Sequence, residues 1–204
     1  MQYLNRWYEV FEPIQVSGSP SGLSLPGEAA VLIPVTAESD PQLILTRRAM
    51  HLASHPGQVS FPGGMWEQAD VGLHDTAVRE TEEEIGVPAS AVKLVAGLNR
   101  RVSRNGVGVT PFAGLVDAAI TPVASPDEID AIFHVPLSYF FEQAPQRIDR
   151  IERNGVRYHM PAWFWQEHEI WGLTALILAE FCGRVCSHPQ GPGEWAMKTL
   201  EERL

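Results

Sequence analysis

A run of glutamates constrains this chain more than any other stretch, because residues 79–86 read Arg-Glu-Thr-Glu-Glu-Glu-Ile-Gly. Residues three or four positions apart share one face of a helix. We therefore expect Glu80, Glu83 and Glu84 to form one cluster of carboxylates, while Glu82 points elsewhere. Such a concentration of like charge needs a partner of opposite sign.

The glutamates occupy the end of a predicted helix. Stop signals follow at Gly86 and Pro88. Like charges at these spacings repel by roughly 0.2–0.5 kcal/mol per pair, and the C-terminal end of a helix is the negative end of its dipole. Arg79 supplies one positive charge, and a divalent ion that prefers carboxylate oxygens, Mg²⁺ or Mn²⁺, would supply the rest. A solvated acidic face is the alternative interpretation.

The segments before this helix predict strands and a glycine-rich loop. Residues 29–36 and 42–46 are apolar and β-branched, which indicates two antiparallel strands joined by a turn. Residues 57–64, Gly-Gln-Val-Ser-Phe-Pro-Gly-Gly, indicate a strand that runs into a loop. Arg47 and Arg48 follow the second strand, where they form a surface salt bridge or contact substrate phosphates.

The segments after the helix predict further strands and a second helix. Residues 92–98 and 106–116 read as strands around a basic loop at 99–105, which either engages phosphates or is solvated. Residues 148–159 predict a hairpin that turns at Asn154-Gly155. Residues 170–185 predict a largely buried helix, which charged residues interrupt too early for a membrane span.

Composition narrows the class of protein. With 204 residues and 45% hydrophobic content, the chain can form one substantial core, so we expect a single domain over 1–204, with 1–28 packing on it as an extension and 187–204 as a tail. The net charge of −10 argues against a nucleic-acid or anionic-membrane binder. Cys182 and Cys186 read as ordinary thiols of a reducing compartment, and no signal peptide is apparent, which predicts a cytoplasmic protein. The sequence leaves a homodimer open.

Around the glutamate run the chain resembles the Nudix box, whose pattern is Gly, five residues, Glu, seven residues, then Arg-Glu-aliphatic-x-Glu-Glu-x-Gly-aliphatic. The matching residues are Gly64, Arg79, Glu80, Glu83, Glu84, Gly86 and Val87. The loop is one residue longer here, so the expected glutamate falls on Val71, beside Asp70, and Thr81 replaces an aliphatic residue.

A second stretch is similar to the coenzyme A pyrophosphatase branch of that family. Residues 45–48, Leu-Thr-Arg-Arg, and 52–64, Leu-Ala-Ser-His-Pro-Gly-Gln-Val-Ser-Phe-Pro-Gly-Gly, follow its signature. Ala53 stands where that branch usually has an arginine, and Arg48 where it has a serine.

The resemblance implies an α/β fold, the α/β/α sandwich of Nudix proteins with a central mixed sheet, which agrees with the order of predicted elements. It implies that Glu80, Glu83 and Glu84 hold Mg²⁺ or Mn²⁺ and that Arg79 orients the carboxylates. One of Glu83, Glu84 or Glu128 takes the proton from water, with Asp127 as the fallback for Glu128; alternatively, Glu128 only hydrogen-bonds its turn. Substrate contacts are expected from Arg47, Arg48, His55, Gln58, Ser60, Gly63 and Gly64, although His55 has an equal claim to supporting its loop.

The implied activity is hydrolysis of the diphosphate of coenzyme A, a small-molecule nucleotide diphosphate, to 3',5'-ADP and 4'-phosphopantetheine. Two alternatives remain. One is a Nudix hydrolase acting on ADP-ribose, a dinucleotide or an oxidised nucleotide, for which Ala53 counts slightly. The other is a catalytically silent nucleotide-binding domain, against which the intact Arg-Glu-x-x-Glu-Glu core counts.

Overall fold

A mixed sheet of eight strands forms the centre of the protein in the computed structural model, which describes residues 8, 27–153 and 156–187. Its strands are β1 (Glu28–Thr36), β2 (Gln42–Arg48), β3 (Val59–Ser60), β4 (Gly63–Met65), β5 (Val92–Gly97), β6 (Arg101–Val102), β7 (Gly108–Val116) and β8 (Ile129–Pro136). β1 runs parallel to β7, and the other pairs within this sheet are antiparallel. The predicted antiparallel pairing of the first two strands is confirmed, with Val35 opposite Leu43.

The glycine-rich segment is inserted between β1 and β2. β3 pairs with β2 while β4 pairs with β1, and each of these central strands has its other edge occupied, β2 by β8 and β1 by β7. A strand has only two hydrogen-bonding edges, so residues 59–65 must lie between β1 and β2. The insertion places the Gly63-Gly64 backbone within the sheet, paired with Ala30 and Val31 of β1.

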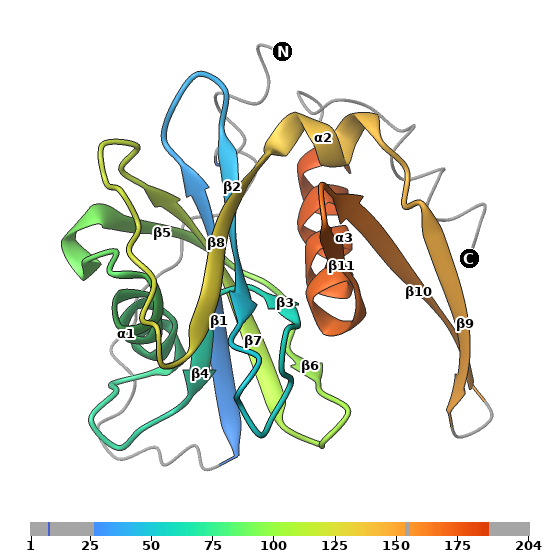
Figure 1. The fold of residues 1–204 in the computed structure, drawn as a ribbon, viewed down its shortest axis with the longest axis horizontal. Helices are drawn as coiled ribbons and strands as arrows, with labels where there is room; N and C mark the ends of the chain where they lie inside the picture. Colours follow the sequence, from blue (N-terminus) through green and yellow to red (C-terminus); the bar gives the residue numbers. More distant parts are fainter. Residues whose placement is uncertain (1–7, 9–26, 154–155, 188–204) are drawn as a thin grey trace.

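Two helices cover the two faces of this sheet (Figure 1). The side chains of β1 alternate between them, because successive residues of a strand point to opposite faces. Ala30 and Leu32 pack with Ala77 of α1 (Leu73–Ile85), whereas Ile33 and Val35 belong to the larger core that contains α3 (Gly172–Ser187). The predicted α/β/α sandwich with a mixed sheet is confirmed.

A smaller antiparallel sheet and two short helices complete the described chain. The sheet has the order β11 (His168–Ile170), β10 (Val156–Trp165), β9 (Arg147–Arg153), and its strand β10 packs on α3. The short helices are a 3₁₀ turn at Ala89–Ala91 and α2 at Leu137–Glu142. Within the described ranges, no helix is long and apolar enough to cross a lipid bilayer.

Some sequence predictions need correction or lie outside the described residues. The last helix begins at Gly172, because Ile170 pairs with Trp163 as part of β11. The basic loop contains a strand, β6, and two of its arginines are engaged by Glu28 and Glu180 rather than left for a phosphate. The predicted packing of 1–28 and 187–204, the Asn154-Gly155 turn and the Cys186 side chain fall outside the described part, whereas Cys182 is buried.

The close approach of β4 to β1 leaves no room for a side chain at position 63, so a substitution of Gly63 should destabilise the protein. A Cβ atom at Gly63 would lie 2.2 Å from the carbonyl oxygen of Ala30, and the φ of Gly63 is +156°. We expect Gly63→Ala to lower the free energy of unfolding by about 2–4 kcal/mol in urea denaturation.

The control is Gly97→Ala on β5, where the nearest atom to a new Cβ is an ordinary 3.6 Å away and φ is not in the left-handed region. An equal loss in the two variants would contradict the packing constraint at Gly63.

Candidate active site

Helix α1 carries the glutamate run onto one face of the sheet. Thr76, Ala77 and Ile85 are buried along its sheet-facing side, which fixes the rotation of the helix about its axis. The helix ends at Gly86, whose left-handed backbone lets its N–H bond the carbonyl of Glu82 at 2.9 Å. This ending leaves the glutamates in the last two turns, as the sequence predicted.

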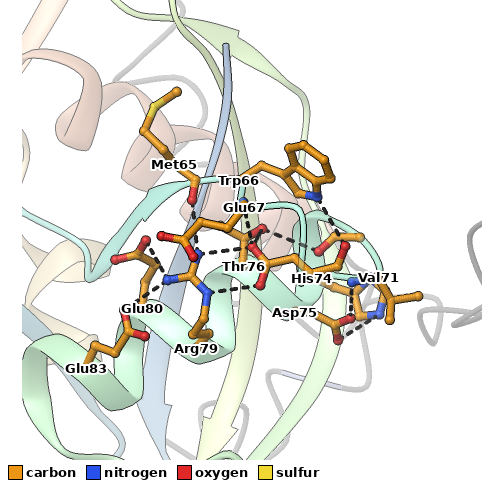
Figure 2. Close-up of polar contacts among 12 residues, drawn as sticks. Met65, Trp66, Glu67, Val71, His74, Asp75, Thr76, Arg79, Glu80 and Glu83 are labelled. Atoms are coloured by element: carbon orange, nitrogen blue, oxygen red, sulfur yellow. Dashed lines mark hydrogen bonds and ion pairs between the residues drawn. The ribbon is translucent and has the colours of Figure 1, made fainter. Parts of the chain in front are cut away.

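Arg79 is the centre of a network that ties the helix to the preceding loop (Figure 2). Its Nε donates to Asp70 at 2.9 Å, one terminal nitrogen donates to Glu80 at 3.0 Å and Glu83 at 2.9 Å, and the other donates to the Met65 carbonyl at 3.0 Å. The hydrogen bond to Asp70 is the main reason why the pKa of Arg79 is raised above its ordinary value. Arg79 therefore stays charged and forms ion pairs with three carboxylates, and its role in the reaction stays a prediction.

Asp70 was not among the predicted site residues, although the sequence places it beside the position where the box would have a glutamate. It is 9% exposed and accepts hydrogen bonds from Arg79, from the Thr76 hydroxyl at 2.8 Å and from the Glu67 N–H at 3.0 Å. Burial pushes the pKa of Asp70 upward, but these hydrogen bonds outweigh it and leave the pKa below its ordinary value. Asp70 thus fills the place that the lengthened loop leaves at Val71, which is exposed.

Glu84 is the most deeply buried carboxylate of the run, with 2% of its surface exposed. The Gly63 N–H donates to it at 3.2 Å, and a terminal nitrogen of Arg48 lies 3.6 Å from its other oxygen. Burial raises the pKa of Glu84 to about 8, and the charges of Glu128 and Glu80 add to this rise. In the absence of a further cation, Glu84 holds a proton near neutral pH.

Glu80 and Glu83 differ in their surroundings. The carboxylate of Glu80 fits beside Gly64, where a Cβ atom would come within 2.4 Å of its oxygen. Burial raises the pKa of Glu80, against the lowering effect of Arg79. The Glu83 side chain is 57% exposed and bonded to Arg79. Glu80 and Glu84 therefore define the inner part of the cluster and Glu83 its outer rim.

Glu128 reaches the same cluster from a different part of the chain. It lies in the turn before β8, where its N–H donates to Ser125 and its carbonyl accepts from Ala49. Its negative charge raises the pKa of both Glu80 and Glu84, so its carboxylate lies within electrostatic range of both. The neighbouring Asp127 uses its carbonyl to bond His51. The role of Glu128 in the reaction stays a prediction.

The donor set fits a divalent metal ion, although the carboxylates have not converged on one point. Among the described residues, no three acidic, histidine or cysteine side chains are grouped closely enough to hold a metal ion. Yet Glu80, Glu84 and Glu128 bring hard oxygen donors and repel one another, and Arg48 and Arg79 are the arginines that face them. Such an excess of partly buried negative charge is what a hard cation offsets.

The predicted substrate-binding residues separate onto two faces of the sheet. Arg48 points toward α1, where it meets Glu84, whereas Arg47 donates two hydrogen bonds to Asp130 near β11. Ser60 lies opposite Thr46 on the α1 side and bonds its hydroxyl, and Gly63-Gly64 follows. Only part of the predicted set is therefore brought next to the carboxylates.

His55 and Gln58 lie in the loop between β2 and β3. The His55 ring is 2.9 Å from the side-chain oxygen of Gln58, and His55 itself has a positive φ of 56°. The Gln58 carbonyl and the Gly57 N–H both bond the backbone of Arg48, which ties the loop to the end of β2. These contacts support the loop; a contact of either side chain with substrate stays a prediction.

A family profile and the relatives found by sequence comparison both identify Nudix proteins as similar to this chain. The profile of the NUDIX domain family matches residues 26–155. A protein of Yersinia enterocolitica called "Uncharacterized Nudix hydrolase NudL" is 40% identical over 157 residues, 77% of this chain and 80% of its own, and its Yersinia pestis counterpart is 40% identical over 77% and 79%.

Solved structures are more distant. A Caenorhabditis elegans Ap4A hydrolase in a binary complex aligns with a TM-score of 0.47 and 15% identity over 54% of this chain and 81% of its own. A MutT/nudix family protein from Enterococcus faecalis aligns with a TM-score of 0.49 and 15% identity over 98% of this chain and 79% of its own.

The raised pKa of Glu84 predicts how the stability of the metal-free protein depends on pH. Because this pKa is about 8 when folded against 4.5 ordinarily, the folded state binds the proton more tightly than the unfolded state. The stabilisation is complete below the ordinary pKa and is lost as pH rises through the folded one. We expect wild type, relative to Glu84→Gln, to lose on the order of 2–4 kcal/mol between the two ends of this window.

Urea unfolding in the presence of a chelator at several pH values measures this difference. The matched control is Glu82→Gln, since Glu82 is an exposed glutamate of the same helix. Its pH profile should follow that of wild type. Parallel profiles for wild type and Glu84→Gln would contradict the assignment.

Proposed function

The chain belongs to the Nudix hydrolase family, and from this premise we propose that it hydrolyses the diphosphate of coenzyme A or of a coenzyme A derivative. The products are 3',5'-ADP and 4'-phosphopantetheine, acylated where the substrate is an acyl form. The observation that carries the reaction is the buried carboxylate cluster beside the Gly63-Gly64 backbone. What supports the substrate is the resemblance of residues 45–64 to the coenzyme A branch.

In this reaction a water oxygen attacks one phosphorus atom, and the bond from that phosphorus to the bridging oxygen breaks. The water loses a proton, and the leaving phosphate carries the charge of the broken bond. The obstacle is electrostatic, because the diphosphate is anionic and the cluster is too. The site residues must therefore bind a counter-charge, place the water and accept its proton.

Glu80, Glu83 and Glu84 are proposed to hold the divalent cation, Mg²⁺ or Mn²⁺. When bound, such an ion neutralises phosphate charge and lowers the pKa of water. Arg79 keeps Glu80 and Glu83 in position through its hydrogen bonds. Glu128 approaches from a separate turn and is, with Glu83 and Glu84, a candidate to accept the proton.

Arg48 is proposed to bind a phosphate oxygen. It faces the cluster at 3.6 Å from Glu84, and its Nε is buried without a hydrogen-bond partner among the described residues. The Arg48 side chain as a whole is 23% exposed, which leaves room for a phosphate oxygen to approach it. A phosphate oxygen bound next to Glu84 would accept a hydrogen bond from this guanidinium.

One sequence feature favours a different substrate. Ala53 replaces the arginine that is usual in the coenzyme A branch. With one basic residue fewer, a substrate with less phosphate charge, such as ADP-ribose or a dinucleotide, is the second candidate.

Product analysis tests both candidates. The protein is incubated with Mg²⁺ or Mn²⁺ and a panel of coenzyme A, ADP-ribose, NADH and nucleoside triphosphates, beside a chelator control. We expect selective release of 3',5'-ADP from coenzyme A. Glu84→Gln should lower the rate by about 100-fold or more, since the variant removes a proposed ligand or base, while Glu82→Gln should stay near wild type.

Two other results would contradict parts of this proposal. Equal turnover across the panel would remove the assignment of coenzyme A and keep the diphosphate hydrolase. Activity that survives both chelation and Glu84→Gln would overturn the proposed mechanism.

A further inference from the structure

A cavity lies on the face of the sheet opposite the carboxylates. It has a volume of about 600 Å³ and is lined by the end of β2, the loop that leads into β3, the start of β8 and the segment from Glu167 to Trp171. β11 runs beside β3 here, and Thr174 of α3 donates to the Val59 carbonyl at 3.0 Å. A cavity of this size is within the range of small-molecule sites.

The cavity and the carboxylate cluster are close neighbours despite facing opposite ways. Arg47 lines the cavity while Arg48, the next residue of β2, meets Glu84. Asp130 lines the cavity while Glu128, two residues earlier, belongs to the cluster. Neighbouring strands flank β2 on both edges at Arg47, so a substrate cannot pass through the sheet there. Arg48 is the last residue of β2 and Ile129 the first of β8, so both places lie at the same end of the sheet, around which a flexible substrate can reach.

The charges of the cavity do not suit phosphate. Its acidic residues are Asp130, Glu167 and Glu169, and Arg47, which also lines it, is committed to Asp130 at 2.6 Å. Glu169 is paired with Arg147 at 2.5 Å, which leaves Glu167 without an arginine or lysine partner among the described residues. An anionic group would be repelled here, whereas an uncharged group with N–H donors would not.

His168 lines the cavity, and its Nε2 lies 3.6 Å from a carboxylate oxygen of Glu167. It is 5% exposed, its ring stacks on Phe133 at 3.8 Å, and its Nδ1 is buried with no partner among the described residues. Burial lowers the pKa of His168, so the ring is neutral at pH 7 and offers one donor and one acceptor. An amide group complements such a ring.

Two apolar side chains lie exposed at the same cavity. Trp171 is 43% exposed and Met50 is 70% exposed, and both line it. Large apolar side chains beside a cavity offer surface that a ligand covers. The cavity therefore combines apolar surface, amide-compatible polar atoms and an excess of negative charge.

We propose that this cavity binds the uncharged, amide-bearing pantetheine arm of the substrate, while the diphosphate lies at the carboxylates on the other face. The inference rests on the proposed function, since it names which part of coenzyme A occupies the second site. In this proposal Trp171 and His168 help to select the substrate and do not contact the reacting atoms.

Binding of pantetheine alone tests the site without any hydrolysis or metal. The chain has six tryptophans, and the indole N–H signal that disappears in Trp171→Ala identifies Trp171 in the NMR spectrum of the full chain. We expect pantetheine, titrated into the millimolar range, to shift that signal, and adenosine and inorganic phosphate to leave it unchanged. Trp171→Ala should weaken pantetheine binding by about tenfold.

The matched control is Phe164→Ala, which removes an aromatic residue that is 41% exposed but does not line the cavity. This variant should bind pantetheine like wild type. An unmoved Trp171 signal, a shift caused by adenosine instead, or equal weakening in both variants would overturn the proposal.

Kinetics separate this proposal from the proposed function. If coenzyme A is hydrolysed, Trp171→Ala should raise KM by about tenfold and change kcat by no more than about twofold. Hydrolysis with an unchanged KM and no pantetheine binding would refute the cavity site and leave the proposed function standing. Pantetheine binding without coenzyme A hydrolysis would refute the function and leave the cavity site standing.

Discussion

The close approach of the Gly63-Gly64 backbone to helix α1 decides where the carboxylates of this protein lie. Residues 59–65 fit between β1 and β2 only because Gly63 has no side chain to meet Ala30. The Gly63 N–H then reaches Glu84, and the space above Gly64 receives Glu80. One local constraint thus brings two loops and a helix into a single site.

This arrangement concentrates negative charge where water is scarce, and the protein offsets it only in part. Arg79 is shared among Asp70, Glu80 and Glu83, and Arg48 approaches Glu84 from β2. The pKa of Glu84 is nevertheless raised to about 8, so its ionised form is poorly compensated. A site that stabilises a proton on Glu84 when empty is one in which a hard cation is favoured when present.

The sequence predicted much of the fold because its patterns are local. Apolar spacing placed α1, and Gly86 marked its end, which the structure reproduces. The partners of side chains that lie far apart in the sequence were harder to predict. No local pattern indicated that Asp70 would accept the hydrogen bond from Arg79. Nor did any pattern indicate that Arg100 would pair with Glu28 and Arg101 with Glu180. These partners meet only after the sheet forms.

Arg47 and Arg48 are neighbours in β2, yet their side chains lie on opposite faces of the sheet. The sequence left each of them either a surface salt bridge or a contact with substrate phosphates, and the alternation of a strand sends neighbouring side chains to opposite faces. Arg48 keeps an unused donor beside the anionic cluster, whereas Arg47 is neutralised by Asp130 beside an uncharged aromatic wall. The end of β2 therefore has the carboxylate cluster on one face of the sheet and the cavity on the other, which is the arrangement that the proposed binding of one substrate at both places requires.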